Sequence, residues 1–358
     1  MRIVMILGLL LLACSSEHRL SDRTTSPLRA ANQVEVVARF EFPPMHVTVS
    51  RDGRIFLDAL ARDRSSAIKT VELKAGGMTP FPALELQHKF STIHGVHVDK
   101  KDRLWVIDHG NYAASHRPRI YGYDIATGKE VEDYAFPAAV APLGSMLNDL
   151  VVDERHEKAL ISDTGSLLRD SAIVEFDIAH RRSRRMLPGH PSLRQGEFDI
   201  VVENQPFKIM QIFRPRYGID GIAIDPAGRW FYYSALNSGE LYRVPVSATL
   251  DESVDDPRLA NQVEKVADIT MTDGMLFDSA GRLYLSDIEH SAIVRLTPAG
   301  QLETVFKDPR FRWPISYALA PDGQIYFTCG SIDRVQLKNR KEIMEIGPYF
   351  LYRFHPEP

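Results

Sequence analysis

The chain contains six copies of one β-hairpin pattern, and this internal repeat constrains the fold more than any other feature. Each copy begins with a short run of mainly apolar residues, passes through a turn that often ends in Gly-Arg or a similar pair, and returns through an apolar and aromatic strand. β-Branched and aromatic residues on both sides of a turn such as Asp-Pro-Ala-Gly are typical of hairpins. The copies start at Met45, His94, Asn148, Asp220, Asp273 and Ser316. The sequence therefore predicts an array of repeated β units.

The strands of these hairpins are apolar nearly throughout rather than alternating between apolar and polar residues. Such strands are covered on both faces, as they are when the blades of a propeller pack face to face. The C-terminal segment from Gly347 supplies a strand for the sixth blade, and the segment from Val34 can join the same sheet and close the ring. We therefore predict an all-β fold, a six-bladed β-propeller over residues 34–358. A two-sheet sandwich is the alternative, but six equivalent hairpins have no natural division into two sheets.

The N-terminus carries the pattern of an export signal. Arg2 precedes an apolar run from Ile3 to Ala13, which is too short for a membrane-spanning helix of about 20 residues. The run ends in Leu-Leu-Ala-Cys, which resembles the bacterial lipobox. We expect residues 1–13 to be a lipoprotein signal peptide and Cys14 to be the lipid-modified residue; a plain secretory peptide cut nearby is the alternative.

Residues 14–33 have few large apolar side chains and are expected to form a flexible tether. On the lipoprotein interpretation the protein is exported to the periplasmic face of an outer membrane or to the cell surface. On the alternative interpretation it is secreted. Contact with a membrane is expected only through the N-terminal lipid, and the oligomeric state is left open.

The composition excludes several partners and reactions. Lys and Arg number 43 against 47 Asp and Glu, a net charge of −4, so there is no electrostatic footprint for a nucleic acid and a small molecule is the expected partner. Two cysteines, Cys14 and Cys329, cannot form a disulfide framework. The chain has no Gly-x-Ser-x-Gly elbow, Walker loop or His-Glu-x-x-His motif. Nucleophilic serine hydrolysis, nucleotide hydrolysis and zinc proteolysis therefore have no support.

Four longer segments occur in a characteristic order: GVHVDKKDRLWVIDHG from Gly95, LNDLVVDERHEKALISDTG from Leu147, GIDGIAIDPAGRWFYYSALNSGELYRVP from Gly218 and DGMLFDSAGRLYLSDIEHSAIVRL from Asp273. Together they resemble the major royal jelly protein and yellow family. The resemblance implies a six-bladed propeller, secretion and, in some members, small amines or other ligands bound in the cavity. More distantly, the same hairpins resemble the gluconolactonase and senescence-marker-protein family, whose propellers hold a divalent metal in the central channel.

Aligning the hairpins by their turns places one residue of each copy at the start of the strand expected to line the channel. Approximate sixfold symmetry makes these side chains converge near the axis. We predict a ligand-binding site at the channel mouth, formed by Asn148, Asp220, Asp273, His94, Ser316 and Tyr317.

Asn148, Asp220 and Asp273 offer oxygen ligands of the type that Ca²⁺ requires. They match positions that resemble metal ligands of the gluconolactonase family, but that family's first-blade Glu is replaced here by the region of Met45 and His46. One interpretation is therefore a Ca²⁺ site with one carboxylate fewer. The other interpretation is structural: an Asp or Asn before Gly accepts hydrogen bonds from backbone N–H groups and so fixes the start of a strand.

Without a metal, Asp220 and Asp273 would be close like charges, and one of them should have a raised pKa. That arrangement suits a cationic amine. The rings of Trp313, Tyr317, Trp105 and Tyr121 would either face such a ligand or, as is usual for aromatic residues in repeated hairpins, pack between blades.

Three functional hypotheses follow. The first is a propeller that binds a small polar or cationic ligand. The second is a Ca²⁺-dependent lactonase or related hydrolase in which His94 or Asp149 moves protons. The third is a scaffold that presents loops to another protein. Residues 187–213 form the longest insertion between hairpins and could cover one end of the channel.

Overall fold

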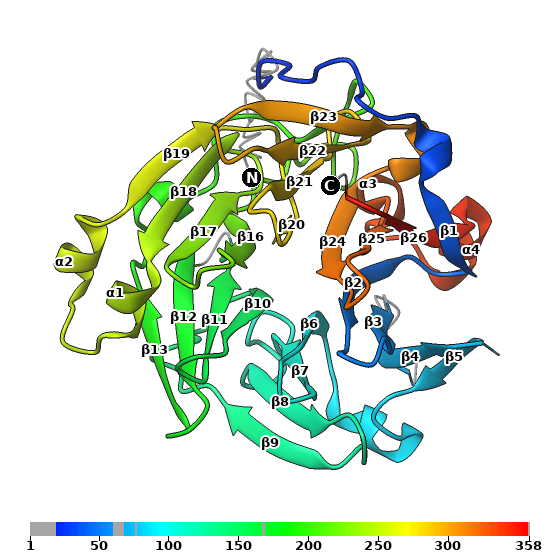
Figure 1. The fold of residues 1–358 in the computed structure, drawn as a ribbon. Coiled ribbons are helices and arrows are strands. Elements are labelled where there is room, and N and C mark those ends of the chain that lie inside the picture. Colours follow the sequence, from blue (N-terminus) through cyan, green and yellow to red (C-terminus); the bar gives the residue numbers. More distant parts are fainter. Residues whose placement is uncertain (1–18, 60–67, 76, 167–168, 357–358) are drawn as a thin grey trace, which may run out of the picture.

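The computed structural model describes residues 19–59, 68–75, 77–166 and 169–356. Six four-stranded antiparallel sheets surround a central axis (Figure 1). The innermost strands β2, β6, β10, β16, β20 and β24 contact one another in a closed ring. The predicted six-bladed β-propeller is therefore confirmed.

Each blade is described here from the axis outwards. Blade one contains β2 (Pro44–Val49), β3 (Ile55–Ala59), β4 (Thr70–Lys74) and β5 (Gly77–Pro80). Blade two contains β6 (Ile93–Val98), β7 (Arg103–Asp108), β8 (Arg119–Asp124) and β9 (Glu130–Ala135). Blade three contains β10 (Leu147–Asp153), β11 (Lys158–Asp163), β12 (Ala172–Asp177) and β13 (Arg182–Met186).

The second half of the ring repeats this order. Blade four contains β16 (Ile219–Ile224), β17 (Trp230–Ala235), β18 (Glu240–Pro245) and β19 (Glu264–Asp268). Blade five contains β20 (Met275–Phe277), β21 (Leu283–Asp287), β22 (Ala292–Leu296) and β23 (Leu302–Lys307). Blade six contains β24 (Pro314–Leu319), β25 (Ile325–Cys329), β26 (Tyr349–Phe354) and β1 (Glu35–Phe40).

The ring is closed by the two ends of the chain, as the sequence indicated. β1 pairs antiparallel with β26, with Glu35 opposite Arg353 and Phe40 opposite Tyr349. Because the outermost strand of blade six comes from the start of the propeller, opening the ring would require breaking this ladder. The closure leaves only short sheet edges.

Insertions between strands carry the short helices. β14 (Val201–Val202) and β15 (Gln205–Pro206) form a small hairpin between blades three and four. α1 (Val246–Leu250) and α2 (Asp256–Ala260) lie between β18 and β19, and α3 (Ile332–Val335) and α4 (Arg340–Ile346) lie between β25 and β26. Single 3-10 turns occupy Ala31–Gln33, Leu84–Lys89, Pro191–Leu193 and Pro309–Phe311. None of the helices in the described ranges is long and apolar enough to cross a membrane.

Acidic residues at the ends of second strands hold the loops that follow. The Asp108 carboxylate accepts backbone N–H groups of Thr92 at 3.0 Å and Gly110 at 2.9 Å. Asp163 accepts those of Met146 at 2.8 Å and Gly165 at 3.0 Å. These recurring carboxylates satisfy backbone donors and therefore have a structural role.

Aromatic side chains fill the space between blades. Trp105 of blade two lies edge-on to Phe176 of blade three, with ring centroids 6.4 Å apart, and both side chains are fully buried. Tyr121 is also buried, 5.3 Å from the ring of Phe90. Trp105 and Tyr121 are thus core residues, as the packing interpretation predicted. Truncating a buried ring of this kind typically costs about 3–5 kcal/mol.

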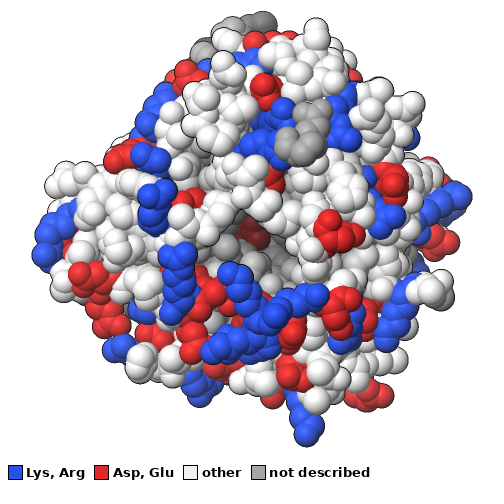
Figure 2. Space-filling view, in the orientation of Figure 1, with Lys and Arg blue, Asp and Glu red and all other residues white. Residues whose placement is uncertain are grey.

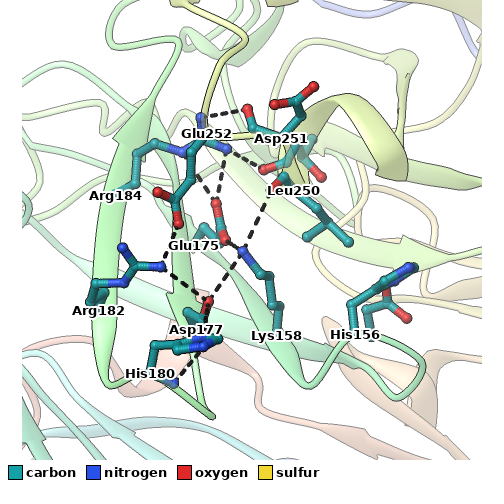
Figure 3. Close-up of polar contacts among 12 residues, drawn as sticks. His156, Lys158, Glu175, Asp177, His180, Arg182, Arg184, Leu250, Asp251 and Glu252 are labelled. Atoms are coloured by element: carbon teal, nitrogen blue, oxygen red, sulfur yellow. Dashed lines mark hydrogen bonds and ion pairs between the residues drawn. The ribbon is translucent and has the colours of Figure 1, made fainter.

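A buried ion-pair network attaches blade three to the helical insertion of blade four (Figure 3). Glu175 on β12 accepts Lys158 Nζ at 2.5 Å and Arg184 at 2.9 Å. Arg184 also donates to the backbone carbonyls of Thr249 at 2.5 Å and Asp251 at 3.1 Å. The Glu175 carboxylate thereby fixes an arginine that reaches across the blade boundary.

Part of the expected tether is attached to the propeller. Leu20 is buried against Gly239, and Arg23 donates to the carbonyl of Gly239 at 3.0 Å. The N–H of Leu28 donates to the carbonyl of Thr304 on β23 at 2.9 Å, and Figure 1 shows this segment running along that strand. One buried leucine and backbone hydrogen bonds are enough to dock a segment that composition alone describes as flexible. The signal peptide and Cys14 lie outside the described residues.

Candidate functional site

The strand register identifies which residues face the axis. In five blades, the pairing of the innermost strand with its neighbour shifts close to the start of that strand. The residue two positions before the first regular pair that follows the shift is equivalent in these five blades; in blade one, for example, Val47 is in the first such pair and Met45 is the equivalent residue. In blade five the count starts from Met275, the first paired residue of β20. These axial positions are Met45, His94, Asn148, Asp220, Asp273 and Ile315, and all six line one cavity of about 430 Å³.

The register corrects one member of the predicted ring. Ile315, not Ser316, occupies the axial position of blade six. Ser316 and Tyr317 line a second cavity, of about 410 Å³. Ser316 Oγ accepts the backbone N–H of Val47 at 3.2 Å. A shift of one residue moves a strand's side chain to the other face, and so Ser316 lies apart from the acidic pair. Tyr317 lies two residues beyond the axial position and does not line the acidic cavity either.

Asp220 and Asp273 form the acidic centre of the first cavity. Asp220 accepts a hydrogen bond from the side-chain amide of Asn148, and Asp273 accepts the indole N–H of Trp313 at 2.7 Å. Burial and the charge of Asp273 raise the pKa of Asp220 well above its ordinary value. Burial raises the pKa of Asp273 to about 7, although the Trp313 hydrogen bond acts in the opposite direction. Both acids therefore hold their protons more tightly than usual, because burial and their mutual repulsion disfavour two charges here, although the charge of His46 partly favours ionised Asp273.

A chain of polar contacts extends from the acidic pair around the axis. The Oδ1 atom of Asn148 lies 2.9 Å from Nδ1 of His94, whose ring meets that of His109 edge-on at 5.0 Å. The predicted residues His94, Asn148 and Asp220 are thus brought into one hydrogen-bonded row. Asp273 lies beyond Asp220 in the next blade and lines the same cavity.

His46 and Asp58 form a buried ion pair beside this row that the sequence did not predict. His46 Nδ1 lies 2.9 Å from the Asp58 carboxylate. Burial lowers the pKa of His46, but the charge and hydrogen bond of Asp58 outweigh this effect and raise it to about 9. The imidazole is therefore charged at neutral pH and adds a cation next to the acidic cavity.

One sequence signal could have revealed this pair. The position after the axial residue is Gly in three blades, namely Gly95, Gly221 and Gly274, but is His46 in blade one. A Cβ at Gly274 would lie 1.9 Å from the carbonyl oxygen of Ile315, so the backbones of neighbouring inner strands touch there. The imidazole of His46 at this position therefore needs space between the strands and a polar partner, and Asp58 is that partner.

Asp149 occupies the same exceptional position in blade three. Its carboxylate accepts its neighbour's backbone N–H, that of Leu150, at 2.8 Å, and it lines the second cavity. Burial raises the pKa of Asp149 to about 6. The structure therefore separates the two residues expected to move protons, because His94 lines the acidic cavity and Asp149 lines the other one.

Aromatic side chains form much of the wall of the acidic cavity. Trp313, Tyr217 and Tyr112 line it. Tyr112 belongs to a run of four residues, 110–113, with positive φ. Consecutive left-handed residues other than glycine are uncommon, and such strain concentrates at functional sites. Of the predicted aromatic residues, Trp313 alone lines this cavity.

The long insertion packs against one wall of the acidic cavity. Phe207, which follows the β14–β15 hairpin, packs edge-on against Trp313 with ring centroids 5.3 Å apart. Ile200 and Val202 are buried in the same cluster. Residues 187–213 thus contact the wall of the cavity, but none of them lines it, and their covering one end of the channel stays a prediction. On the face of the molecule shown in Figure 2, a hollow lies at the centre of the propeller, and acidic and basic side chains surround it.

The donors of the acidic cavity suit a cation of the Ca²⁺ type in kind but are few in number. Ca²⁺ takes six to eight oxygen ligands. Asn148, Asp220 and Asp273 supply two carboxylates and one amide. Within the described ranges, no group of three His, Cys, Asp or Glu side chains could hold a metal ion. Backbone carbonyls and water would have to complete the coordination.

A family model described as major royal jelly protein matches residues 91–308. The chain belongs to this family. Two relatives from Apis mellifera agree: Major royal jelly protein 6 is 25% identical over 212 residues, which cover 55% of this chain and 45% of the relative. Major royal jelly protein 3 is 26% identical over 211 residues, which cover 55% and 36%. The match thus spans less than half the length of either royal jelly protein.

Solved propellers of other families share the fold of this royal jelly family member. A gluconolactonase from Xanthomonas campestris superposes with a TM-score of 0.58 at 14% identity, covering 90% of this chain and 89% of that one. A luciferin-regenerating enzyme gives 0.57 at 13% identity, with 90% and 95% covered. At such identities the likeness shows the propeller fold alone.

Proposed function

We propose that this royal jelly family member binds a small cationic ligand, an organic amine, in the axial cavity. The observation that carries the proposal is the pair of buried carboxylates, Asp220 and Asp273. Within the described residues, the hydrogen bonds of the pair come from Asn148 and Trp313, both neutral donors. A ligand cation would relieve their mutual repulsion and gain two charged partners.

The surrounding cavity has the size and lining that such a ligand needs. About 430 Å³ falls within the range of small-molecule sites, roughly 300–1,000 Å³. Trp313, Tyr217 and Tyr112 line the cavity, and aromatic rings attract an ammonium group by cation–π interaction. Asn148 and His94 add polar atoms that can orient a hydroxyl group on the ligand.

Calorimetric titration against a panel of amines, with sugars and lactones for comparison, tests the proposal. We expect an amine to bind, and we expect Asp220→Asn and Asp273→Asn each to weaken binding at least tenfold, as loss of a charged hydrogen bond typically does. Glu264→Gln, on exposed strand β19, is the control and should bind as the unmodified chain does. Amine binding that survives both cavity substitutions would reject this site.

A Ca²⁺-dependent lactonase is the second candidate, favoured by the same repulsion between Asp220 and Asp273. These residues and Asn148 would hold the ion, which supplies Lewis-acid polarisation of a carbonyl or water. His94 lines the cavity and is the group that could take up a proton. Thermal melts with Ca²⁺ and with EDTA distinguish the candidates, because an ion that binds only the folded chain must raise its melting temperature. No shift at millimolar Ca²⁺ would reject the lactonase.

We further propose that the protein is exported and anchored through a lipid on Cys14. The lipobox-like sequence supports this proposal. Mass spectrometry of the protein purified from membranes should show a processed chain that begins with a diacylated Cys14. A chain cut at another position and without lipid would support plain secretion instead. A channel that binds neither amines nor Ca²⁺ would favour the interaction scaffold.

A further inference from the structure

The insertion that packs against Trp313 of the acidic cavity ends in an exposed apolar turn. Ile209 and Phe213 form an isolated β-bridge, and the turn between them holds Met210 and Gln211 at positive φ. Ile212 is 83% exposed, Met210 76% and Phe213 43%. Ile212 and Met210 are the most exposed large apolar side chains in the described part of the chain. Apolar side chains held outwards on a tight turn are typical of a contact surface.

Basic residues flank this turn on both sides. Lys208 precedes it, and Arg214 and Arg216 follow it. Arg214 and Arg216 share a single carboxylate, that of Asp199, so the surroundings of the turn keep an excess of positive charge. An apolar turn flanked by basic residues complements an anionic phospholipid surface. The apolar side chains would insert between the headgroups and the acyl chains, while the cations would contact the anionic headgroups.

The N-terminal segment of the described chain contacts the same insertion. Arg19 donates to the backbone carbonyl of Asn204, in the turn between β14 and β15 of this insertion, at 3.2 Å. Cys14 precedes Arg19 by five residues, which span at most about 18 Å when extended. A lipid on Cys14 would therefore be held within reach of the insertion that carries the apolar turn.

We propose that the turn Ile209–Phe213 inserts into the surface of an anionic bilayer and orients the propeller on it. Leu337, 64% exposed, and Lys338 line the acidic cavity at its mouth. Ile209, at the base of the turn, packs against the apolar cluster that holds Trp313 and Val335. The bilayer contact therefore turns this mouth towards the membrane surface. The proximity of Cys14 rests on the lipid anchor proposed above; the contact made by the turn does not.

Vesicle sedimentation of the full chain carrying Cys14→Ala tests the turn independently of the lipid. We expect this chain to bind phosphatidylcholine vesicles that contain phosphatidylglycerol, and to bind pure phosphatidylcholine more weakly. Adding Met210→Ser and Ile212→Ser should weaken binding about tenfold or more. Adding Lys208→Gln should weaken it about fivefold, and only on anionic vesicles. Val131→Ser, which changes an exposed apolar residue on β9, is the matched control and should bind normally.

A second readout reports insertion directly. In the same Cys14→Ala chain, the fluorescence added by Ile212→Trp should shift to the blue on anionic vesicles, whereas that added by Val131→Trp should not. Absence of vesicle binding, or equal binding by the Met210→Ser, Ile212→Ser chain, would overturn the proposal. Self-association that the same two substitutions abolish, without vesicle binding, would assign the turn to a second copy and overturn it as well. If the turn binds vesicles but the native chain carries no lipid, only the anchor on Cys14 is rejected.

Discussion

The indole N–H of Trp313 donates to the carboxylate of Asp273 at 2.7 Å, and the other side of the same ring system meets Phe207 of the insertion. One buried side chain thus connects the insertion to the acidic pair. Asp273 is held by a neutral donor, so its charge is only partly compensated. The stability of the cavity and its affinity for cations are therefore linked through this contact.

Trp313→Phe should destabilise the fold and raise the pKa of Asp273 further. The phenyl ring keeps most of the packing but lacks the N–H group, and losing a buried hydrogen bond to a charged group costs about 1–3 kcal/mol. Urea unfolding monitored by circular dichroism measures the loss. Trp230→Phe is the control, because Trp230 packs against Arg243, whose guanidinium carbon lies 4.0 Å from the indole ring centroid, and does not line the acidic cavity. Equal effects of the two substitutions would contradict a special role for Trp313.

Asp273→Asn should stabilise the protein at neutral pH more than at acid pH. The folded-state pKa of about 7 lies above the ordinary 3.8, so the folded chain binds this proton more tightly than the unfolded chain does. Ionisation therefore destabilises the fold as the pH rises from about 4 to 7. The advantage of the variant should grow over this range by at most about 1.4 kcal/mol per pH unit. Urea unfolding at several pH values measures it, and a constant difference would show that Asp273 ionises normally.

Asp58→Asn should cost stability mainly at acid and neutral pH. The pKa of His46 is raised from 6.5 to about 9, so the contribution of the ion pair is complete below pH 6.5 and is lost as the pH rises through 9. We expect a loss of about 3 kcal/mol near pH 6, in the range measured for broken buried pairs. Unfolding at a series of pH values should show the loss shrinking above pH 6.5. His46→Gln should remove the same pH-dependent contribution; a loss that is equal at pH 6 and pH 9 would mean that the pair is not charged.

Glu175→Gln should destabilise the contact between blades three and four. The substitution leaves the partly buried Lys158 and Arg184 without their shared carboxylate, which costs up to about 3–5 kcal/mol. Glu252→Gln is a matched control in the same network (Figure 3), because Glu252 pairs with Arg182 at 2.8 Å where both side chains are more than half exposed. Exposed pairs contribute about 0–1 kcal/mol. Chemical denaturation that ranks the two substitutions equally would show that burial does not matter here.

The acidic cavity could be predicted only in part. His94, Asn148, Asp220 and Asp273 were identified because the repeat places them at equivalent positions. Ser316 was not in its predicted place, because the alignment set the sixth copy one residue late: Ile315, not Ser316, precedes Gln324 by nine residues, the spacing that separates Asp273 from Arg282. A side chain's face alternates with every residue, so an error of one position removes it from the site.

The sequence by itself determined the number of blades, the hairpin in each and the closure of the ring by the segment from Val34, because these depend on local turns and on apolar runs. Only the tertiary structure decided which residues meet across the axis. The pairing of His46 with Asp58 and the docking of Leu20 on blade four depend on contacts between parts of the chain that no local pattern relates. Such contacts form when neighbouring backbones are brought together, and their geometry is set by the packing of whole blades.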